Sequence, residues 1–180
     1  MGAVAGSLLY PDGSFQHGAF RFPNLWMTFL DLFPLHHRLS NSSINGRYPR
    51  KAYYDDFEID HPLGACFMVR RDVVEEVGAF CPEFFLYCEE IDWCMRMKEA
   101  GWKVYCHPSA KVVHYGGQST RQVRDPMFVE LYRSRLLLFR RHYSPLFQAV
   151  NRAVTGAGIL WELFCALRSL GRGTRHVSRY

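Results

Sequence analysis

The chain has 180 residues and a mass of 21.0 kDa, which fits one domain of ordinary size, and its 48% hydrophobic and 22% charged residues exclude a disordered tail. Its longest nearly apolar stretch, residues 153–167, contains Glu162 and is shorter than the roughly 20 residues of a membrane-spanning helix, so no such helix is expected. The net charge of +5 is uneven: residues 1–120 carry 11 basic and 14 acidic side chains, whereas residues 121–180 carry 11 arginines and 3 acids. The N-terminus lacks the basic region of a signal peptide.

The N-terminal third predicts a hairpin, a short helix and a long loop. Residues 3–10 alternate weakly and lead into the turn Pro11-Asp12-Gly13-Ser14, after which FQHGAF can form the second strand. Asn24 can cap an amphipathic helix that runs through Phe33. Residues 36–60 show no periodicity, and a loop of that length in a compact domain is usually functional or mobile.

Regular structure is predicted again from Gly64 onwards. A buried strand is expected at 65–69, followed by a helix that begins with the D-x-x-E pattern of Asp72 and Glu75 and ends at Gly78. A second helix is expected at 89–100, with its end at Gly101, and two strands at 102–106 and 110–115, separated by His107-Pro108. Helices are expected again from about residue 126, with a break at Ser144-Pro145. Strands and helices alternate, so the fold class is α/β. Three or four strands are few for a covered sheet, and we expect a part that belongs in front of Gly2 to be missing.

The basic C-terminal part, residues 126–180, is predicted to be an amphipathic helical tail. Its apolar residues recur at helical spacing among the arginines: Phe128, Leu131, Tyr132, Leu138, Phe139, Leu146, Val150, Leu160, Trp161, Phe164 and Leu167. Arginine favours bidentate contact with phosphate, so an anionic membrane surface is the expected partner. The alternative is that these helices simply close the core. Nucleic acid is disfavoured because no known reader motif is present.

The six cysteines form no C-x-x-C pair, and several have apolar neighbours, so we predict reduced, buried thiols in a cytosolic protein. A zinc site formed by Cys88, Cys94, Cys106 and His107 is the alternative. The irregular spacing of these residues makes it the weaker interpretation.

Three carboxylates, Glu89, Glu90 and Asp92, begin the helix predicted at 89–100, directly after an aromatic run. One interpretation is structural, because acids in a first turn are stabilised by the helix dipole and Asp92 can pair with Arg96 on the surface. The other is chemical, because like charges and aromatic neighbours raise a carboxyl pKa until it suits a general base near neutral pH.

His114 ends the last predicted strand and precedes Gly116-Gly117. A lone histidine at a strand end is more often a surface or hydrogen-bonded residue than a metal ligand. The two glycines would, however, let a ligand approach it closely, and imidazole together with carboxylates would suit Mn²⁺ or Mg²⁺.

The stretch GACFMVRRDVVEEVGAFCPEFFLYCEEIDWCMRMKEAGWKVYCHPSAKVVHYGGQS resembles the second half of family 2 glycosyltransferases, especially the bacterial rhamnosyltransferase-like branch. The flanking segments LLYPDGSFQ, FRFP and YRSRLLLFRRHY agree with it. The resemblance implies part of a GT-A fold, which binds a nucleotide-sugar donor, a divalent metal and an acceptor hydroxyl. It also implies a sugar transfer that inverts the anomeric centre.

The resemblance also implies roles for individual residues. They are Glu90 as catalytic base with Glu89 beside it, Asp92 as an acceptor-site or helix-supporting group, His114 as metal ligand, and Gly64 and Ala65 as a small-residue turn at the sugar pocket. The physical chemistry agrees, because a nucleotide diphosphate is a good leaving group, and the remaining task is to deprotonate the acceptor hydroxyl.

The sequence departs from the family pattern in several places. Glu90 stands where Asp is usual, Cys81-Pro82 replaces Asp-Glu, and Asp60-His61-Pro62 replaces an aromatic-containing turn. The family's N-terminal half, with the nucleotide pocket and the D-x-D metal motif, is not found, and Asp56-Phe57-Glu58 is not accepted as a substitute because no apolar strand precedes it. We therefore expect the isolated chain to bind nucleotide sugars weakly or not at all.

The sequence thus predicts a partial GT-A domain at residues 1–125, its acceptor and catalytic half, followed by the basic helical tail at 126–180. The expected function is transfer of a sugar from a nucleotide-diphospho-sugar to a glycan or lipid-linked acceptor, with the protein peripheral on the inner face of the cell membrane. The alternative is a non-catalytic remnant that binds a membrane or a partner through its arginine-rich helices.

Overall fold

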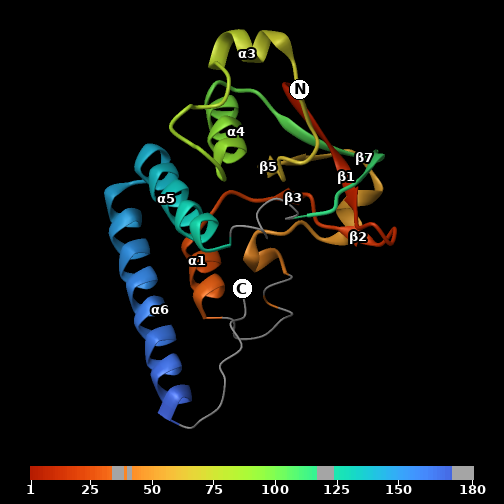
Figure 1. Ribbon diagram of the computed structural model, residues 1–180. Coiled ribbons are helices and arrows are strands. Elements are labelled where there is room, and N and C mark those ends of the chain that lie inside the picture. The colour runs from red at the N-terminus through yellow and green to blue at the C-terminus, as the bar shows by residue number, and fades with distance from the viewer. Residues whose placement is uncertain (34–38, 40–41, 117–123, 172–180) are drawn as a thin grey trace.

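The computed structural model describes residues 1–33, 39, 42–116 and 124–171. Figure 1 shows a strongly curled sheet on one side of the molecule. Helices α1 (Leu25–Leu32), α5 (Arg124–His142) and α6 (Pro145–Gly171) lie on the other side, and α4 (Glu89–Glu99) lies between them. Helices and strands pack together, which confirms the predicted α/β fold class. Because α4 contacts strands on one side and α5 on the other, it is the element around which the two sides are organised.

The main sheet contains five strands. They are β1 (Ala3–Leu9), β2 (Phe15–Gln16), β4 (Phe57–Ile59), β6 (Phe67–Val69) and β7 (Val104–Val113). The order is β2-β1-β7-β4, with β6 also paired to β1; β1 and β7 run parallel and the other pairs run antiparallel. A separate pair joins β3 (Ala19–Phe20) to β5 (His61–Pro62). The predicted hairpin is confirmed, because β2 returns along β1 after a turn in which Asp12 accepts the N–H of Ser14.

The two strands predicted at 102–106 and 110–115 are one strand, β7, with a bulge. Gly6 of β1 pairs with His107 of β7, but the next residue of β1, Ser7, pairs with Lys111. Residues 108–110 therefore bulge out of the ladder. Pro108 has no N–H to offer the ladder, which favours a bulge there. The carbonyl oxygen of Ala110 lies only 2.6 Å from where a Cβ of Gly6 would be, so this close approach requires glycine.

The strand predicted as buried at 65–69 is the short, half-exposed strand β6. Phe67 and Val69 are partly buried, whereas the side chain of Met68 is 73% exposed. β6 pairs with β1 and is covered on one face by Trp93, whose ring meets that of Phe67 edge to face. The prediction of full burial was wrong because an apolar run does not reveal that its strand lies at a sheet edge.

The long loop predicted at 36–60 contains short regular elements in its described part. They are the 3-10 helices η1 (Ser43–Asn45) and η2 (Arg50–Tyr54) and the strand β4. Each is too short to give a periodic pattern. β4 is stabilised by pairing with β7, where Ile59 lies opposite Val104 and both side chains are fully buried.

The helices predicted from capping signals are present. In α1 (Leu25–Leu32), Asn24 accepts the N–H of Met27 at 3.0 Å, as predicted. Helix α3 (Arg71–Val77) ends at Gly78, as predicted, and this glycine has φ 78°. The predicted start at Asp72 is two residues late, because the N-cap residue is Arg70 and Asp72 lies inside the first turn. The carboxylate of Asp72 binds the guanidinium of Arg70 instead of capping the helix.

Two apolar clusters meet at α4 (Glu89–Glu99). The first lies between α4 and the sheet and includes Met97, Ile59 and Val104, and the second joins α4 to α5 (Arg124–His142) and includes Leu138 and Phe139. Leu138 and Phe139 were predicted to lie on an amphipathic tail. Both are buried, so this part of α5 closes the core.

Helix α6 (Pro145–Gly171) follows the predicted break at Ser144-Pro145 and packs along α1. The hydroxyl of Thr28 donates to Asn151 at 2.8 Å, and a Cβ at Gly158 would lie 2.8 Å from the side chain of Leu32, so the two helices approach closely. In the described part of the chain, no helix combines the length and the apolar character that a membrane span requires. The last predicted tail arginines, Arg172, Arg175 and Arg179, lie outside the described residues.

The cysteines are all free thiols, and Cys88, Cys94 and Cys106 are buried, whereas Cys66, Cys81 and Cys165 are only partly so. Within the described ranges, no three side chains of the metal-binding types are grouped to hold an ion. The zinc alternative is therefore wrong, and His107 instead binds Asp56 at 2.6 Å.

Candidate active site

The predicted catalytic acids lie in the first turn of α4, directly after a sharply turning backbone segment. Tyr87 and Cys88 both have φ 67°, a left-handed conformation that residues other than glycine rarely adopt. Cys88 is the N-cap residue of α4 and makes no capping hydrogen bond with its side chain. These two residues turn the chain from the preceding aromatic run into the helix, and they fix the direction in which Glu89 and Glu90 project.

Glu90 has the raised pKa that a general base for a hydroxyl group needs near neutral pH. Burial, with a smaller contribution from the charge of Glu89, raises the pKa of this carboxyl to about 7, although hydrogen bonds from the backbone N–H groups of Glu90 and Ile91 oppose the shift. With this pKa, a large share of the side chain is ionised at neutral pH and able to accept a proton. The direction of the shift is the one expected from crowded acids beside aromatic residues.

Gly64 lies next to Glu90, although 25 positions of the sequence separate them. A Cβ built on Gly64 would be 4.0 Å from both Cβ and Cγ of Glu90. Gly64 and Ala65 form a turn directly after β5, and the N–H of Ala65 donates to the carbonyl of Leu63 at 2.7 Å. The structure therefore brings the predicted small-residue turn against the predicted base, and the absent side chain of Gly64 leaves room beside the carboxylate.

Glu89 carries a buried oxygen that no donor satisfies. Its Oε2 atom makes no hydrogen bond within the described residues. Buried carboxylate oxygens normally have partners, so an unpartnered one beside the predicted base is a position that a polar ligand could satisfy. The predicted role of Glu89 beside the base fits this geometry.

Asp92 lies on the opposite side of α4 from Glu90, because two residues along a helix correspond to about 200° of rotation. It is fully buried, and its carboxylate binds Arg96 at 2.9 Å, Arg141 at 3.0 Å and His142 at 2.8 Å. Burial alone would raise the pKa of Asp92, but the hydrogen bonds from His142 and Arg96 outweigh it and lower the pKa.

The predicted pair of Asp92 with Arg96 is present, but its placement on the surface was wrong. Arg141 and His142 come from α5, so Asp92 joins α4 to α5 through a buried ionic network. Of the two roles that the family resemblance offered for Asp92, this geometry favours the helix-supporting one.

His114, the predicted metal ligand, directly follows β7 and contacts a neutral side chain. Its Nδ1 atom lies 3.1 Å from Oε1 of Gln16, and its backbone N–H donates to the carbonyl of Leu9. In the part of the chain that is described, His114 is not grouped with two further His, Cys, Asp or Glu side chains. The described residues therefore do not form a site for Mn²⁺ or Mg²⁺, and we derive no step through a metal.

The sequence analysis missed the contribution of α5 to this region. Ser134 is 1% exposed, and its hydroxyl donates at 2.7 Å to the carbonyl of Leu86, directly before the left-handed pair. Arg141 and His142 hold Asp92, as described above. No local pattern could have indicated these contacts, since each joins residues about 50 positions apart.

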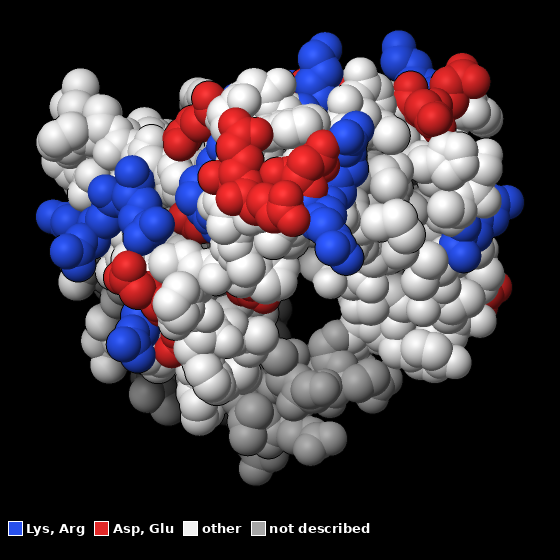
Figure 2. Space-filling model, turned by 90° about the horizontal axis from the view of Figure 1, so that it is seen from above, with Lys and Arg blue, Asp and Glu red and all other residues white. Residues whose placement is uncertain are grey.

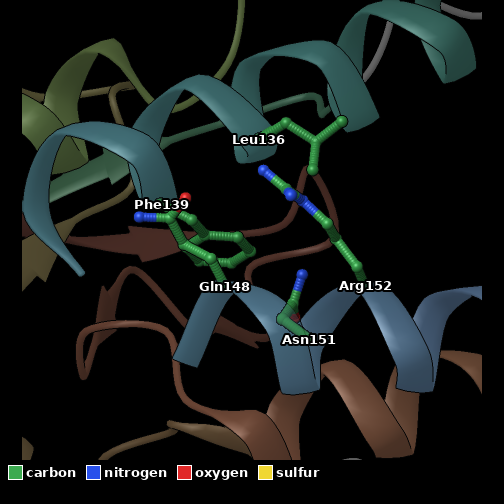
Figure 3. A pocket seen from close by; sticks show the side chains of 5 residues that line it. All are labelled: Leu136, Phe139, Gln148, Asn151 and Arg152. Carbon is green, nitrogen blue, oxygen red and sulfur yellow. The ribbon is translucent and has the colours of Figure 1, made fainter. Parts of the chain in front are cut away.

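Two hollows lie near the helices, and neither contains Glu90. An open cleft of about 460 Å³ lies at the far end of α4, between Phe22, Met95, Lys98 and Tyr143. Figure 3 shows the gap between α5 and α6, where Arg152 reaches toward Leu136. This gap is too narrow for a water molecule, so it is a helix-packing contact and not a ligand site.

The face seen in Figure 2 carries acidic and basic side chains close together, with a group of acids near its middle. It therefore offers no uniformly basic area to an anionic partner. On the helical side of the molecule, α6 instead exposes large apolar side chains, each between 49% and 69% exposed: Ile159, Leu160, Trp161, Leu163, Phe164 and Leu167.

Segments of this chain match a protein family and several known proteins. Residues 37–133 match the family model described as glycosyltransferase like family 2. A stretch of 63 residues is 41% identical to the N-acetylglucosaminyl-diphospho-decaprenol L-rhamnosyltransferase of Mycobacterium tuberculosis, covering 35% of this chain and 20% of that protein. Over 82 residues the chain is 31% identical to the rhamnosyltransferase WbbL of Escherichia coli, covering 46% of this chain and 31% of WbbL.

A more distant match extends further along the chain. The O-antigen biosynthesis protein RfbC of Myxococcus xanthus is 26% identical over 121 residues, which cover 67% of this chain and 9% of RfbC. The matched segments thus span less than a third of the length of each of these relatives.

Proposed function

Because the chain belongs to the glycosyltransferase-like family 2, with an α/β structure consistent with part of a GT-A fold, we propose that it forms the acceptor and catalytic part of a sugar transferase. The observation that carries this proposal is Glu90, whose pKa is raised to about 7 and whose side chain lies against Gly64, where a Cβ would be 4.0 Å away. A carboxylate with these properties is suited to deprotonate an acceptor hydroxyl.

In the proposed reaction, the acceptor oxygen attacks the anomeric carbon of a nucleotide-diphospho-sugar. The bond from that carbon to the diphosphate oxygen breaks, its electron pair leaves with the nucleotide diphosphate, and the hydroxyl proton passes to Glu90. Attack opposite the leaving group inverts the anomeric centre. The buried surroundings of Glu90 limit competition from water for the same proton.

We propose a lipid-linked or cell-surface glycan as the acceptor. This assignment is supported by the names of the relatives, which include a transferase acting on N-acetylglucosaminyl-diphospho-decaprenol and a protein of O-antigen biosynthesis. The two relatives that are named as rhamnosyltransferases favour rhamnose as the donor sugar.

An acceptor in a membrane suits the exposed apolar face of α6, and we propose an anionic membrane surface, on the cytoplasmic side, as a partner. Trp161 and Phe164 can insert at the headgroup level, while Arg168, whose guanidinium lies over the Phe164 ring, remains exposed for phosphate contact. Each arginine close to an anionic leaflet contributes about 1 kcal/mol. The apolar contribution would make binding only partly sensitive to salt.

Vesicle flotation tests this surface. The double variant Trp161→Ser/Phe164→Ser should bind anionic phosphatidylglycerol vesicles far less than wild type. Trp26→Ser is the matched control, because it removes a tryptophan that is 66% exposed on another helix, α1, and its loss should change nothing. Wild type that fails to float with anionic vesicles at low salt would remove the membrane from this proposal.

The second candidate is a non-catalytic remnant that uses α6 to bind a membrane or a partner. A transfer assay on the complete product of the reading frame that contains these residues separates the two candidates. It supplies UDP-, dTDP- and GDP-sugars with Mn²⁺ and a polyprenyl-diphospho-sugar acceptor. Label in the lipid fraction that disappears in Glu90→Gln supports the transferase, whereas no transfer from any donor favours the remnant.

A further inference from the structure

The loop that delivers Glu90 holds a conformation that its own residues do not favour. Tyr87 and Cys88 are two consecutive non-glycine residues at φ 67°, immediately before the first turn of α4. Single residues visit the left-handed region at a cost, and they remain there only where surrounding contacts enforce it. The contacts that enforce this turn therefore determine where the carboxylate of Glu90 lies.

Helix α5 supplies these contacts from about 50 positions further along the chain. The buried hydroxyl of Ser134 donates to the carbonyl of Leu86 at 2.7 Å, which fixes the peptide group that leads into Tyr87. A serine inside a helix commonly bonds back to a carbonyl one turn earlier, but here the hydroxyl is directed to another element. The side chains of Phe84 and Cys88, on either side of this carbonyl, are buried in the cluster that α5 shares with α4.

We propose that Ser134 is a positioning residue, which holds the Leu86 carbonyl so that the turn at residues 87–88 presents Glu90 in its buried orientation. The role rests on the proposed function of Glu90 as the base. It also means that α5, assigned from the sequence to a separate basic tail, acts as part of the catalytic architecture. Without the hydroxyl, the partly buried Leu86 carbonyl would lose this partner, and the turn could relax toward water.

The test measures the titration of Glu90 directly, by ¹³C NMR of the glutamate carboxyl groups in the full chain, with the resonance assigned by its loss in Glu90→Gln. Burial is the main cause of the raised pKa of Glu90, so a turn that relaxes should admit water and lower that pKa. We expect Ser134→Ala to lower it by at least about half a unit. Ser134→Thr, which keeps the hydroxyl, should restore the wild-type titration.

Thr28→Ala is the matched control, because it removes another buried hydroxyl that makes a 2.8 Å hydrogen bond between helices, at the contact of α1 with α6. It should lower the melting temperature as Ser134→Ala does and leave the titration of Glu90 unchanged. If Ser134→Ala does not fold, Ser134→Cys has nearly the same volume with a weak donor, and the same shift is expected from it.

Two results would overturn the proposal: an unchanged Glu90 titration in the folded Ser134 variant, or an equal shift in Thr28→Ala, which would indicate general loosening. The titration uses no substrate, so it succeeds or fails independently of the transfer assay. A protein that transfers no sugar while Ser134 controls the Glu90 titration would refute the proposed function and leave the positioning contact established.

Discussion

Replacement of Asp92 by Asn should destabilise the fold strongly. Asp92 is fully buried, and its charge is compensated by Arg96, Arg141 and His142. Asparagine keeps the size of the side chain but leaves these partners facing a neutral amide. Removing one member of a buried ionic network costs about 3–5 kcal/mol, a large part of the stability of a domain of this size. We therefore expect the free energy of unfolding to fall by about that amount.

The assay is urea denaturation followed by tryptophan fluorescence, with Asp72→Asn as the matched control. Asp72 pairs with Arg70, but both side chains are about half exposed and the pair is screened by solvent, so the loss should be small. A difference of less than 1 kcal/mol between the two variants would refute the assignment of Asp92 as the ionic link between α4 and α5.

The pH dependence gives an independent check of the same network. The pKa of Asp92 is lowered below its ordinary value of 3.8 in the folded protein, so its carboxylate stabilises the fold at higher pH. This contribution is lost as the pH falls below about 4 and through the folded-state pKa. The stability difference between wild type and Asp92→Asn should therefore be full at neutral pH and shrink in acid. A difference that stays constant down to acidic pH would contradict the lowered pKa.

Three further predictions concern the site. Glu90→Gln should reduce kcat by about 100-fold or more, with donor affinity nearly unchanged. The activity of the wild type should rise with pH through about 7, as Glu90 ionises. A larger loss in Glu89→Gln would show that the base is one residue earlier. Gly64→Ala should retain activity, since its Cβ would lie 4.0 Å from Glu90, whereas Gly64→Leu should raise the acceptor KM by filling the space beside the carboxylate. His114→Ala should leave the Mn²⁺ requirement unchanged in a metal titration, because His114 contacts Gln16 and is not grouped with further metal-binding side chains among the described residues; a weakened requirement would make it a metal ligand.

Features that depend on neighbouring residues could be predicted from the sequence. The Asn24 cap, the turn before β2 and the end of α3 at Gly78 each rest on contacts within a few positions. The pKa direction of Glu90 was predictable only in part: Glu89, which raises it, is adjacent in the chain, whereas burial, the larger cause, comes from the fold. In the cap and the turns, by contrast, residue type alone carries the physical cause.

Features that depend on distant pairing could not be predicted. β4 is three residues long and owes its existence to β7, about 47 positions later, so no periodic signal marks it. The burial of Asp92 has the same origin, since Arg96 lies one turn away but Arg141 and His142 come from α5. The sequence indicates a possible surface pair of Asp92 with Arg96, and only the fold shows that Asp92 is buried under α5.

The placement of these groups on α4 links stability to the proposed chemistry. Glu90 projects toward Gly64 on one side of the helix, and Asp92 projects toward α5 on the other. The first turn that carries both residues begins at Cys88, whose preceding loop is held by Ser134 of α5. A change on the α5 side can therefore move the carboxylate on the other side without contacting substrate. The helix that the sequence assigns to a tail, α5, is thus an integral support of the site, whereas the exposed apolar face available to a membrane belongs to α6.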